Sequence, residues 1–84
     1  MYDLDLDNFG SRLKETIKES GLTQKSLAER IGLSVTAMNN YVAGRIPDAK
    51  LMYKICGILG IRIEWILTGQ GVKRQEDEFD LSND

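Results

Sequence analysis

The chain has 84 residues, of which 42% are hydrophobic and 29% are charged. Its one cysteine excludes an internal disulfide framework and a zinc site built from several cysteines, and the absence of histidine removes the most common general base. No apolar run approaches the roughly 20 residues of a membrane-spanning helix, and the acidic start does not resemble a signal peptide. This composition predicts a single small cytoplasmic domain with no cofactor, no metal and no enzymatic site.

Charge is distributed unevenly along the chain, although the formal net charge is only −2. Residues 11–54 hold eight basic and four acidic side chains, whereas residues 72–84 hold two basic and five acidic ones, and residues 1–10 hold three acidic ones alone. A basic body between acidic ends favours an anionic partner. We therefore expect an acidic N-terminal lead-in over residues 1–7, a folded domain over residues 8–71 and an acidic flexible tail or linker over residues 72–84.

Apolar periodicity predicts five helices. Phe9, Leu13 and Ile17 recur every four residues and form the apolar stripe of the first helix, for which Asp7 or Asn8 is the expected N-cap. In chain order the predicted ranges are 9–22, 24–31, 35–43, 48–59 and 63–68. Five glycines fall at or just past the ends of these ranges, where a left-handed residue stops a helix: Gly21, Gly32, Gly44, Gly60 and Gly69.

The second and third predicted helices lie unusually close together in the sequence. Only Gly32-Leu33-Ser34 separates them, so the two helices must cross steeply, and the small side chain of Ala28 allows a close approach. The apolar residues that these helices can share in a core are Leu27, Ile31, Leu33, Met38 and Tyr41. This spacing is typical of a helix-turn-helix motif, and one helix before it and two after it strengthen the interpretation.

Residues 9–71 resemble the DNA-binding domains of lambda-type phage repressors and of the Xre family. The similarity lies in the stretches SGLTQKSLAERIGLS, NNYVAGRIPD and GIRIEWILTGQG, and it covers roughly three-quarters of the chain. The resemblance implies an all-α, compact five-helix, lambda-repressor-like fold. It also implies a transcriptional repressor of phage type that binds a double-stranded DNA operator.

The helix over Val35–Ala43 is the expected reading element. Four residues on one of its faces are expected to contact bases: Val35, Thr36, Asn39 and Asn40. An asparagine amide can form two hydrogen bonds with adenine in the major groove, and the methyl groups of Val35 and Thr36 suit the thymine methyl. The family places its base contacts at these matching positions, whereas without the motif both asparagines could simply be solvated surface.

Five other residues are expected to contact DNA phosphates: Gln24, Lys25, Ser34, Arg45 and Lys50. Gln24 opens the second helix, where the resemblance implies a phosphate contact and where the helix amides attract an anion. Arg45 and Lys50 flank the turn into the fourth helix, where the family also contacts phosphate. The alternative for each is an ordinary solvated side chain. By contrast, Arg12 is expected on the exposed face of the first helix.

The sequence departs from the family at two places. Many relatives carry Arg at position 17 and Glu at position 42, whereas this chain has Ile17 and Val42. Because replacing both partners of a buried ion pair by apolar residues avoids desolvation, we expect these two side chains to be buried together. The lead-in is acidic and would be repelled by phosphate, so no DNA-wrapping arm is assigned to it. We expect Cys56 to be a buried, inert thiol.

A palindromic operator and a homodimer are expected, because a two-fold pair of reading helices contacts two half-sites one turn apart. The predicted dimer surface surrounds the fifth helix together with Tyr2 and Phe9. In the tail, Phe79 and Leu81 could instead anchor a sixth helix. Two other functions stay open: an antitoxin or restriction-control regulator of the same fold, and a protein-interaction module that no longer binds DNA. No small-molecule ligand is indicated.

Overall fold

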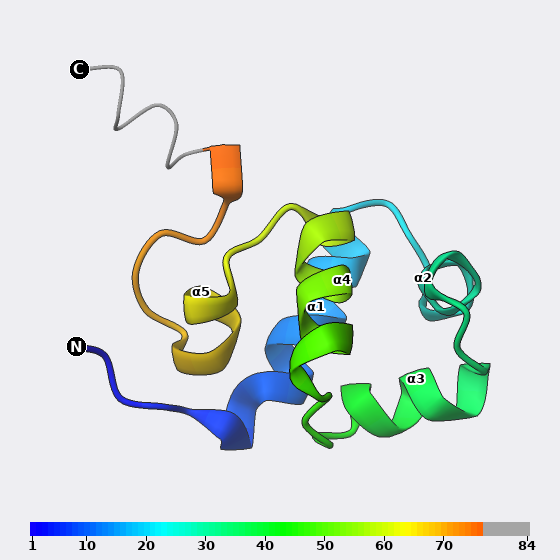
Figure 1. The fold of residues 1–84 in the computed structure, drawn as a ribbon, viewed down its shortest axis with the longest axis horizontal. Helices are drawn as coiled ribbons and strands as arrows, with labels where there is room; N and C mark the ends of the chain where they lie inside the picture. Colours follow the sequence, from blue (N-terminus) through cyan, green and yellow to red (C-terminus); the bar gives the residue numbers. More distant parts are fainter. Residues whose placement is uncertain (77–84) are drawn as a thin grey trace.

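The computed structural model describes residues 1–76. It contains a short 3-10 helix and five α-helices: η1 (Leu6–Asn8), α1 (Phe9–Glu19), α2 (Gln24–Ile31), α3 (Val35–Val42), α4 (Ala49–Leu59) and α5 (Ile63–Thr68). Figure 1 shows α4 between α5 on one side and α2 on the other, with α1 behind it and α3 running beneath. The predicted five-helix, all-α fold is confirmed. No helix within residues 1–76 is long and apolar enough to cross a bilayer.

Side-chain caps begin three of the five helices. Thr23 Oγ1 accepts a hydrogen bond from the Ser26 backbone N–H at 3.0 Å, and Ser26 Oγ accepts one in return from the Thr23 N–H at 2.9 Å. Ser34 Oγ accepts from the Ala37 N–H at 3.0 Å, and an Asp48 carboxylate oxygen begins α4 in the same way. Each such cap contributes about 1 kcal/mol of helix stability. These local bonds fix where α2, α3 and α4 start.

The ends of α1 and α3 differ slightly from their predicted positions. The first helix ends at Glu19 and not at residue 22, because Ser20 Oγ donates to the Ile17 carbonyl at 2.6 Å and the chain then turns away. The third helix ends at Val42, with Ala43 as its C-cap. At the start of α1, Asn8 occupies the N-cap position without a capping bond, since its amide donates to the Asp5 carboxylate.

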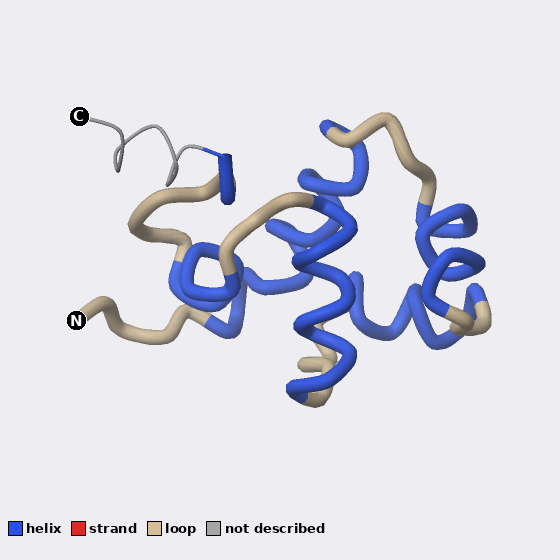
Figure 2. Tube along the Cα trace, turned by 45° about the horizontal axis from the view of Figure 1, so that its top comes forward, coloured by secondary structure: helices blue, strands red, loops and turns tan. Residues whose placement is uncertain are grey.

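A single hydrophobic core joins all five helices. Its members are the buried apolar residues Phe9, Leu13, Ile17, Leu27, Ala28, Met38, Met52, Ile55, Cys56, Leu59, Ile61 and Ile66. The α1 stripe of Phe9, Leu13 and Ile17 belongs to this core. Figure 2 shows the helices in blue, joined by loops in tan. Phe9 is fully buried, so its expected place on a dimer surface is wrong. Burial raises the pKa of Cys56 to about 11, in line with the inert thiol that was expected.

Helices α1 and α3 approach each other closely at Gly10. A Cβ atom on Gly10 would lie only 2.2 Å from the Val42 carbonyl oxygen. Ile17 lies about two turns further along α1 and is 2% exposed. Val42 is partly buried against the same core. The predicted burial is therefore confirmed for Ile17 and only partial for Val42. This close contact sets the position of α3 relative to the rest of the domain.

Arg12 is a structural residue, and its expected place on an exposed helix face is wrong. Its side chain is only 11% exposed. Nε donates to the Ile66 carbonyl oxygen at 2.8 Å, and Nη1 donates to the Asp5 carboxylate at 3.0 Å. Hydrogen bonds from Asn8 and then from Arg12 lower the pKa of Asp5. The acidic lead-in is thus bonded to α1, and the Asp5 N–H also donates to the Leu67 carbonyl at 2.8 Å.

The first residues of the expected tail are bonded to the folded domain. The Arg62 N–H donates to the Lys73 carbonyl oxygen at 2.9 Å, and the Gln75 N–H donates to the Gly60 carbonyl oxygen at 3.0 Å. Residues 73–75 therefore run alongside the loop between α4 and α5, whose backbone groups need hydrogen-bond partners. This pairing attaches residues 73–75 to the loop, and the domain boundary at residue 72 stays a prediction.

Side chains hold the same segment from the other side. Lys73 Nζ lies 2.6 Å from a Glu19 carboxylate oxygen and 4.7 Å from the centre of the Trp65 ring. The Lys73 ammonium lowers the pKa of Glu19 through this hydrogen bond. The alternative anchors Phe79 and Leu81 lie outside the described residues.

Candidate nucleic-acid interface

The turn between α2 and α3 brings the two helices into a helix-turn-helix. Gly32 takes a left-handed conformation with φ of 78°, and the Leu33 N–H donates to the Ala28 carbonyl at 2.8 Å. Ala28 is 1% exposed, and Leu27 and Met38 are fully buried between the helices. The small side chain and the left-handed glycine together allow the steep crossing that the spacing predicted. The motif is thus a rigid unit packed on α1.

One face of α3 carries exposed polar and methyl-bearing side chains. The four residues expected to contact bases are all exposed and lie on this face: Val35, Thr36, Asn39 and Asn40. Met38 on the opposite face is fully buried, and it anchors the helix to the core. An α-helix fits the major groove, where amides and methyl groups distinguish the base pairs. The α3 face therefore has the chemistry needed for direct reading of DNA sequence.

Three of the expected phosphate contacts lie at the starts of α2 and α3. Gln24 is the first residue of α2 and is half-buried, whereas Lys25 beside it is fully exposed. Ser34 uses an oxygen lone pair to cap α3, so its hydroxyl proton stays available to an acceptor outside the domain. A phosphate oxygen is such an acceptor, since it can take bonds from hydroxyl, amide and ammonium donors.

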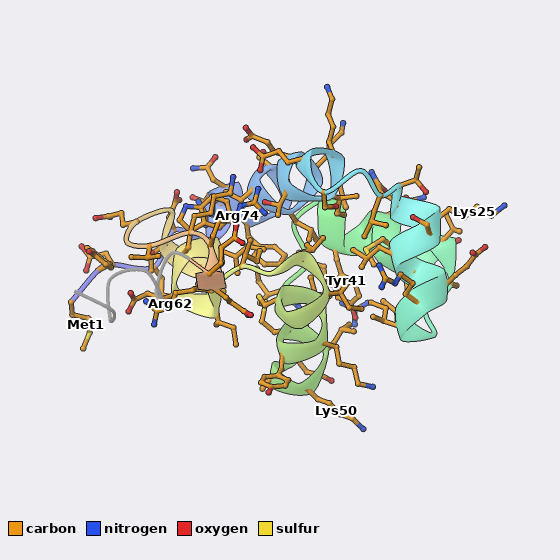
Figure 3. The ribbon with its side chains drawn as sticks, turned by 90° about the horizontal axis from the view of Figure 1, so that it is seen from above. Met1, Lys25, Tyr41, Lys50, Arg62 and Arg74 are labelled. Atoms are coloured by element: carbon orange, nitrogen blue, oxygen red, sulfur yellow. The ribbon has the colours of Figure 1, made fainter. Side chains whose placement is uncertain are left out.

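The other two expected contacts lie beyond the C-terminus of α3. Arg45 is exposed, and its guanidinium carbon lies 5.7 Å from the centre of the Tyr41 ring. Lys50 extends from the first turn of α4. Figure 3 shows Lys25 at the right edge and Lys50 at the lower edge of the molecule, with Tyr41 further inside in that view. The supporting role of Tyr41 was missed, although a spacing of four residues before Arg45 is a signal for such a pair.

Within residues 1–76 the cations of this surface form no ion pairs. Within residues 1–76 the ion pairs join α1 to the two terminal segments: Arg12–Asp5, Lys73–Glu19 and Arg74–Glu19. Lys25, Arg45 and Lys50 can therefore neutralise phosphate charge without breaking an existing pair. No group of three or more metal-ligating side chains occurs among the described residues. The arrangement offers charge and hydrogen bonds for binding.

A helix-turn-helix family model matches residues 13–66, which is more than half of the chain. The HTH-type transcriptional regulator PrtR of Pseudomonas aeruginosa is 31% identical over 65 residues, covering 77% of this chain and 25% of that protein. The HTH-type transcriptional regulator YqaE of Bacillus subtilis is 30% identical over 79 residues, covering 90% of this chain and 68% of that protein.

The repressor protein CI of Enterobacteria phage phi80 is 24% identical over 76 residues, covering 90% of this chain and 32% of that protein. The chain thus spans about a quarter of the length of PrtR and about two thirds of the length of YqaE. No solved structure matches the chain significantly. With the five-helix fold and the exposed α3 face, these matches show that the chain belongs to the helix-turn-helix family of lambda-repressor and Xre-type DNA-binding regulators.

Proposed function

We propose that this protein represses transcription by binding a palindromic operator in double-stranded DNA as a homodimer, with α3 in the major groove. The observation that carries the proposal is that α3 has a buried face at Met38 and an exposed face at Asn39 and Asn40. Beside α3 lie Lys25, Arg45 and Lys50, which form no ion pair within residues 1–76. Relatives named as transcriptional regulators and a phage repressor support the same role. As part of the same proposal, the protein acts in the cytoplasm and is not an enzyme.

The residues divide into two roles. Val35, Thr36, Asn39 and Asn40 read base edges, with the asparagine amides suited to adenine and the methyl groups suited to thymine. Phosphate contacts come from Gln24, Lys25, Ser34, Arg45 and Lys50, and they set the orientation of α3 without reading sequence. Tyr41 supports Arg45 by lying under its guanidinium group.

A dimer follows from the length of the reading element. Eight residues of α-helix are about 12 Å long, so α3 spans only a few base pairs. Two copies related by a two-fold axis would place their α3 helices in successive major grooves about 34 Å apart. The surface that we assign to dimer contacts lies around α5, where Ile63 is 39% exposed and Tyr2 on the adjacent lead-in is 45% exposed.

The experiment that tests the proposal is selection of bound sequences from random DNA duplexes, followed by affinity measurements over a range of salt concentrations. Enrichment of a two-fold symmetric site with half-sites one turn apart would support it. Equal recovery of all sequences would contradict it and favour the protein-interaction module. An antitoxin or restriction-control role would also give a symmetric site, and the genes adjoining that site distinguish these regulators.

Two substitutions separate reading from positioning. Replacing Asn39 by Ala should cost about 1–3 kcal/mol on the selected operator and relax the preference at one base pair of each half-site. Replacing Arg45 by Ala should weaken binding to operator and random DNA alike and reduce the salt slope by about 1. If the Asn39 variant keeps the normal ratio of operator to random binding, then α3 is not the reading element.

A further inference from the structure

The outer face of α4 is crossed by a groove that the DNA interface does not use. On the side of α5, a hollow of about 420 Å³ is lined by Tyr53, Gly57, Ile63 and Gln75 among others. On the side of α2, a second hollow of about 360 Å³ again includes Tyr53 and Gly57. Because the two hollows share Tyr53 and Gly57, we treat them as one groove over the middle of α4. Figure 1 shows that α4 lies between α5 and α2.

Gly57 lies in the floor of this groove, and the fold itself does not require a glycine there. A Cβ atom on Gly57 would meet no atom within 4 Å among the described residues, and the backbone is ordinary α-helix. Glycine inside a helix destabilises it relative to alanine. A residue without a side chain is useful at such a position when another chain must approach the helix backbone closely. Tyr53, which is 73% exposed, forms an apolar wall one turn earlier.

Positive charge marks the α2 end of the groove. Arg30 and Lys54 line that hollow together with Ile31 and Ile58. Both cations are exposed, and neither forms an ion pair within residues 1–76. The groove therefore combines an apolar floor with cations at one end, which is complementary to an acidic segment that contains large apolar side chains.

The chain itself supplies such a segment immediately beside the groove. Gln75 lines the first hollow, and residues 77–84 follow it with the sequence DEFDLSND. This stretch has four acidic residues, no basic residue, and Phe79 and Leu81 as its large apolar side chains. Fully extended, eight residues reach about 26 Å, which is more than the width of about 10–12 Å of an α-helix.

We propose that the groove across Gly57 is a docking site for the acidic segment 77–84 of the same chain. Phe79 packs over Gly57 against Tyr53, and the acidic residues on either side of it lie near Lys54 and Arg30. The contact combines burial of apolar surface with charge attraction, so it weakens when either component is removed and when salt is added. It extends the C-terminal pairing of residues 73–75 onto α4.

The test uses the full chain in solution and follows backbone amide signals of residues 53–58 and 77–84 by NMR. Replacing Phe79 by Ala should shift the signals of residues 53–58 and lower the ratio of docked to undocked segment by about tenfold. Ser82→Ala, a change in the same segment, is the matched control and should leave residues 53–58 unchanged. Equal spectra for the Phe79 variant and the wild type would overturn the proposal.

Two groove variants complete the test. Gly57→Leu fills the open space over α4 without a clash inside the domain, so the fold should persist while the segment is released. Lys54→Glu should lower the docked ratio by roughly two- to fivefold, as expected for an exposed ion pair, whereas Lys14→Glu on the exposed face of α1 should not. The proposed dimer around α5 would itself give shifts that grow with protein concentration, so the Phe79→Ala variant is measured at the same concentrations. Concentration-dependent shifts of residues 53–58 that disappear in that variant would show that a second copy supplies the segment, and would also overturn the proposal.

Discussion

Two glycines lie in the interiors of helices α1 and α4, and their surroundings differ completely. Gly10 faces the backbone of α3, where an added Cβ atom would lie 2.2 Å from the Val42 carbonyl oxygen. Gly57 faces outward from α4, where an added Cβ atom would meet nothing within 4 Å. The first glycine is required by the packing of α3 against α1. The second weakens its own helix and has no such structural reason.

This difference shows how the same residue type can serve the fold at one site and a contact outside it at another. At Gly10 the missing side chain lets α3 approach α1, so the position of α3 depends on it. At Gly57 the missing side chain leaves a groove beside a segment of opposite charge. The energetic consequences of filling each position should therefore have opposite signs.

The largest effect is expected at Gly10. Gly10→Ala places a methyl group against a backbone carbonyl, which cannot move aside as a flexible side chain can, so we expect a loss of about 3 kcal/mol in unfolding free energy. Urea denaturation measures this loss. DNA affinity of the remaining folded protein should fall as well, because α3 is displaced. A variant as stable as the wild type would mean that α1 and α3 separate more easily than their contact indicates.

A somewhat smaller loss is expected at Ile17, on the same helix. Ile17→Arg introduces an unpaired charge at a site that is 2% exposed, and about 2–3 kcal/mol should be lost after the long side chain bends toward solvent. Adding Val42→Glu should recover part of the loss, because it restores the ion pair that many relatives have. Denaturation of both single variants and the double variant forms the cycle that measures this coupling. Strict additivity would contradict contact between positions 17 and 42.

Gly57→Ala should change stability in the opposite direction. The substitution improves helix propensity and meets no atom, so the unfolding free energy should rise by about 0.5–1 kcal/mol. Thermal unfolding measures the rise. If segment 77–84 contacts this position, the added methyl group weakens that contact and the rise in unfolding free energy is smaller. The full rise should then return when Gly57→Ala is made in a Phe79→Ala background. A clear destabilisation in both backgrounds would mean that Gly57 serves the fold after all.

The smallest effect concerns the lead-in next to α1. The hydrogen bonds from Asn8 and Arg12 lower the pKa of Asp5 in the folded state, so the carboxylate stabilises the fold above the unfolded pKa. That contribution is lost as the pH falls through the lowered folded value. Asp5→Asn should therefore flatten the fall in stability below about pH 4. Acid titration followed by circular dichroism measures it, and identical acid curves for variant and wild type would contradict it.

Local signals in the sequence were sufficient for most of the helices. The caps at Thr23, Ser34 and Asp48 bond to backbone groups three residues away, so the starts of α2, α3 and α4 could be predicted from neighbouring residues alone. The exposed face of α3 followed from helical periodicity, because Met38 and the two asparagines lie on opposite sides of a short helix. The role of each exposed residue toward DNA stays a prediction.

Only the tertiary structure decided how distant parts of the chain meet. Arg12 looked like a surface residue because its partner, the Ile66 carbonyl, lies 54 residues away and leaves no periodic signal. The same holds for Lys73, whose partner Glu19 lies 54 residues earlier. The sequence by itself determined which segments become helices and which α3 face is polar, since these depend on bonds within a turn or two. The anchoring of the lead-in and of residues 73–75, and the groove over Gly57, depend on packing among separate helices, which local propensity does not encode.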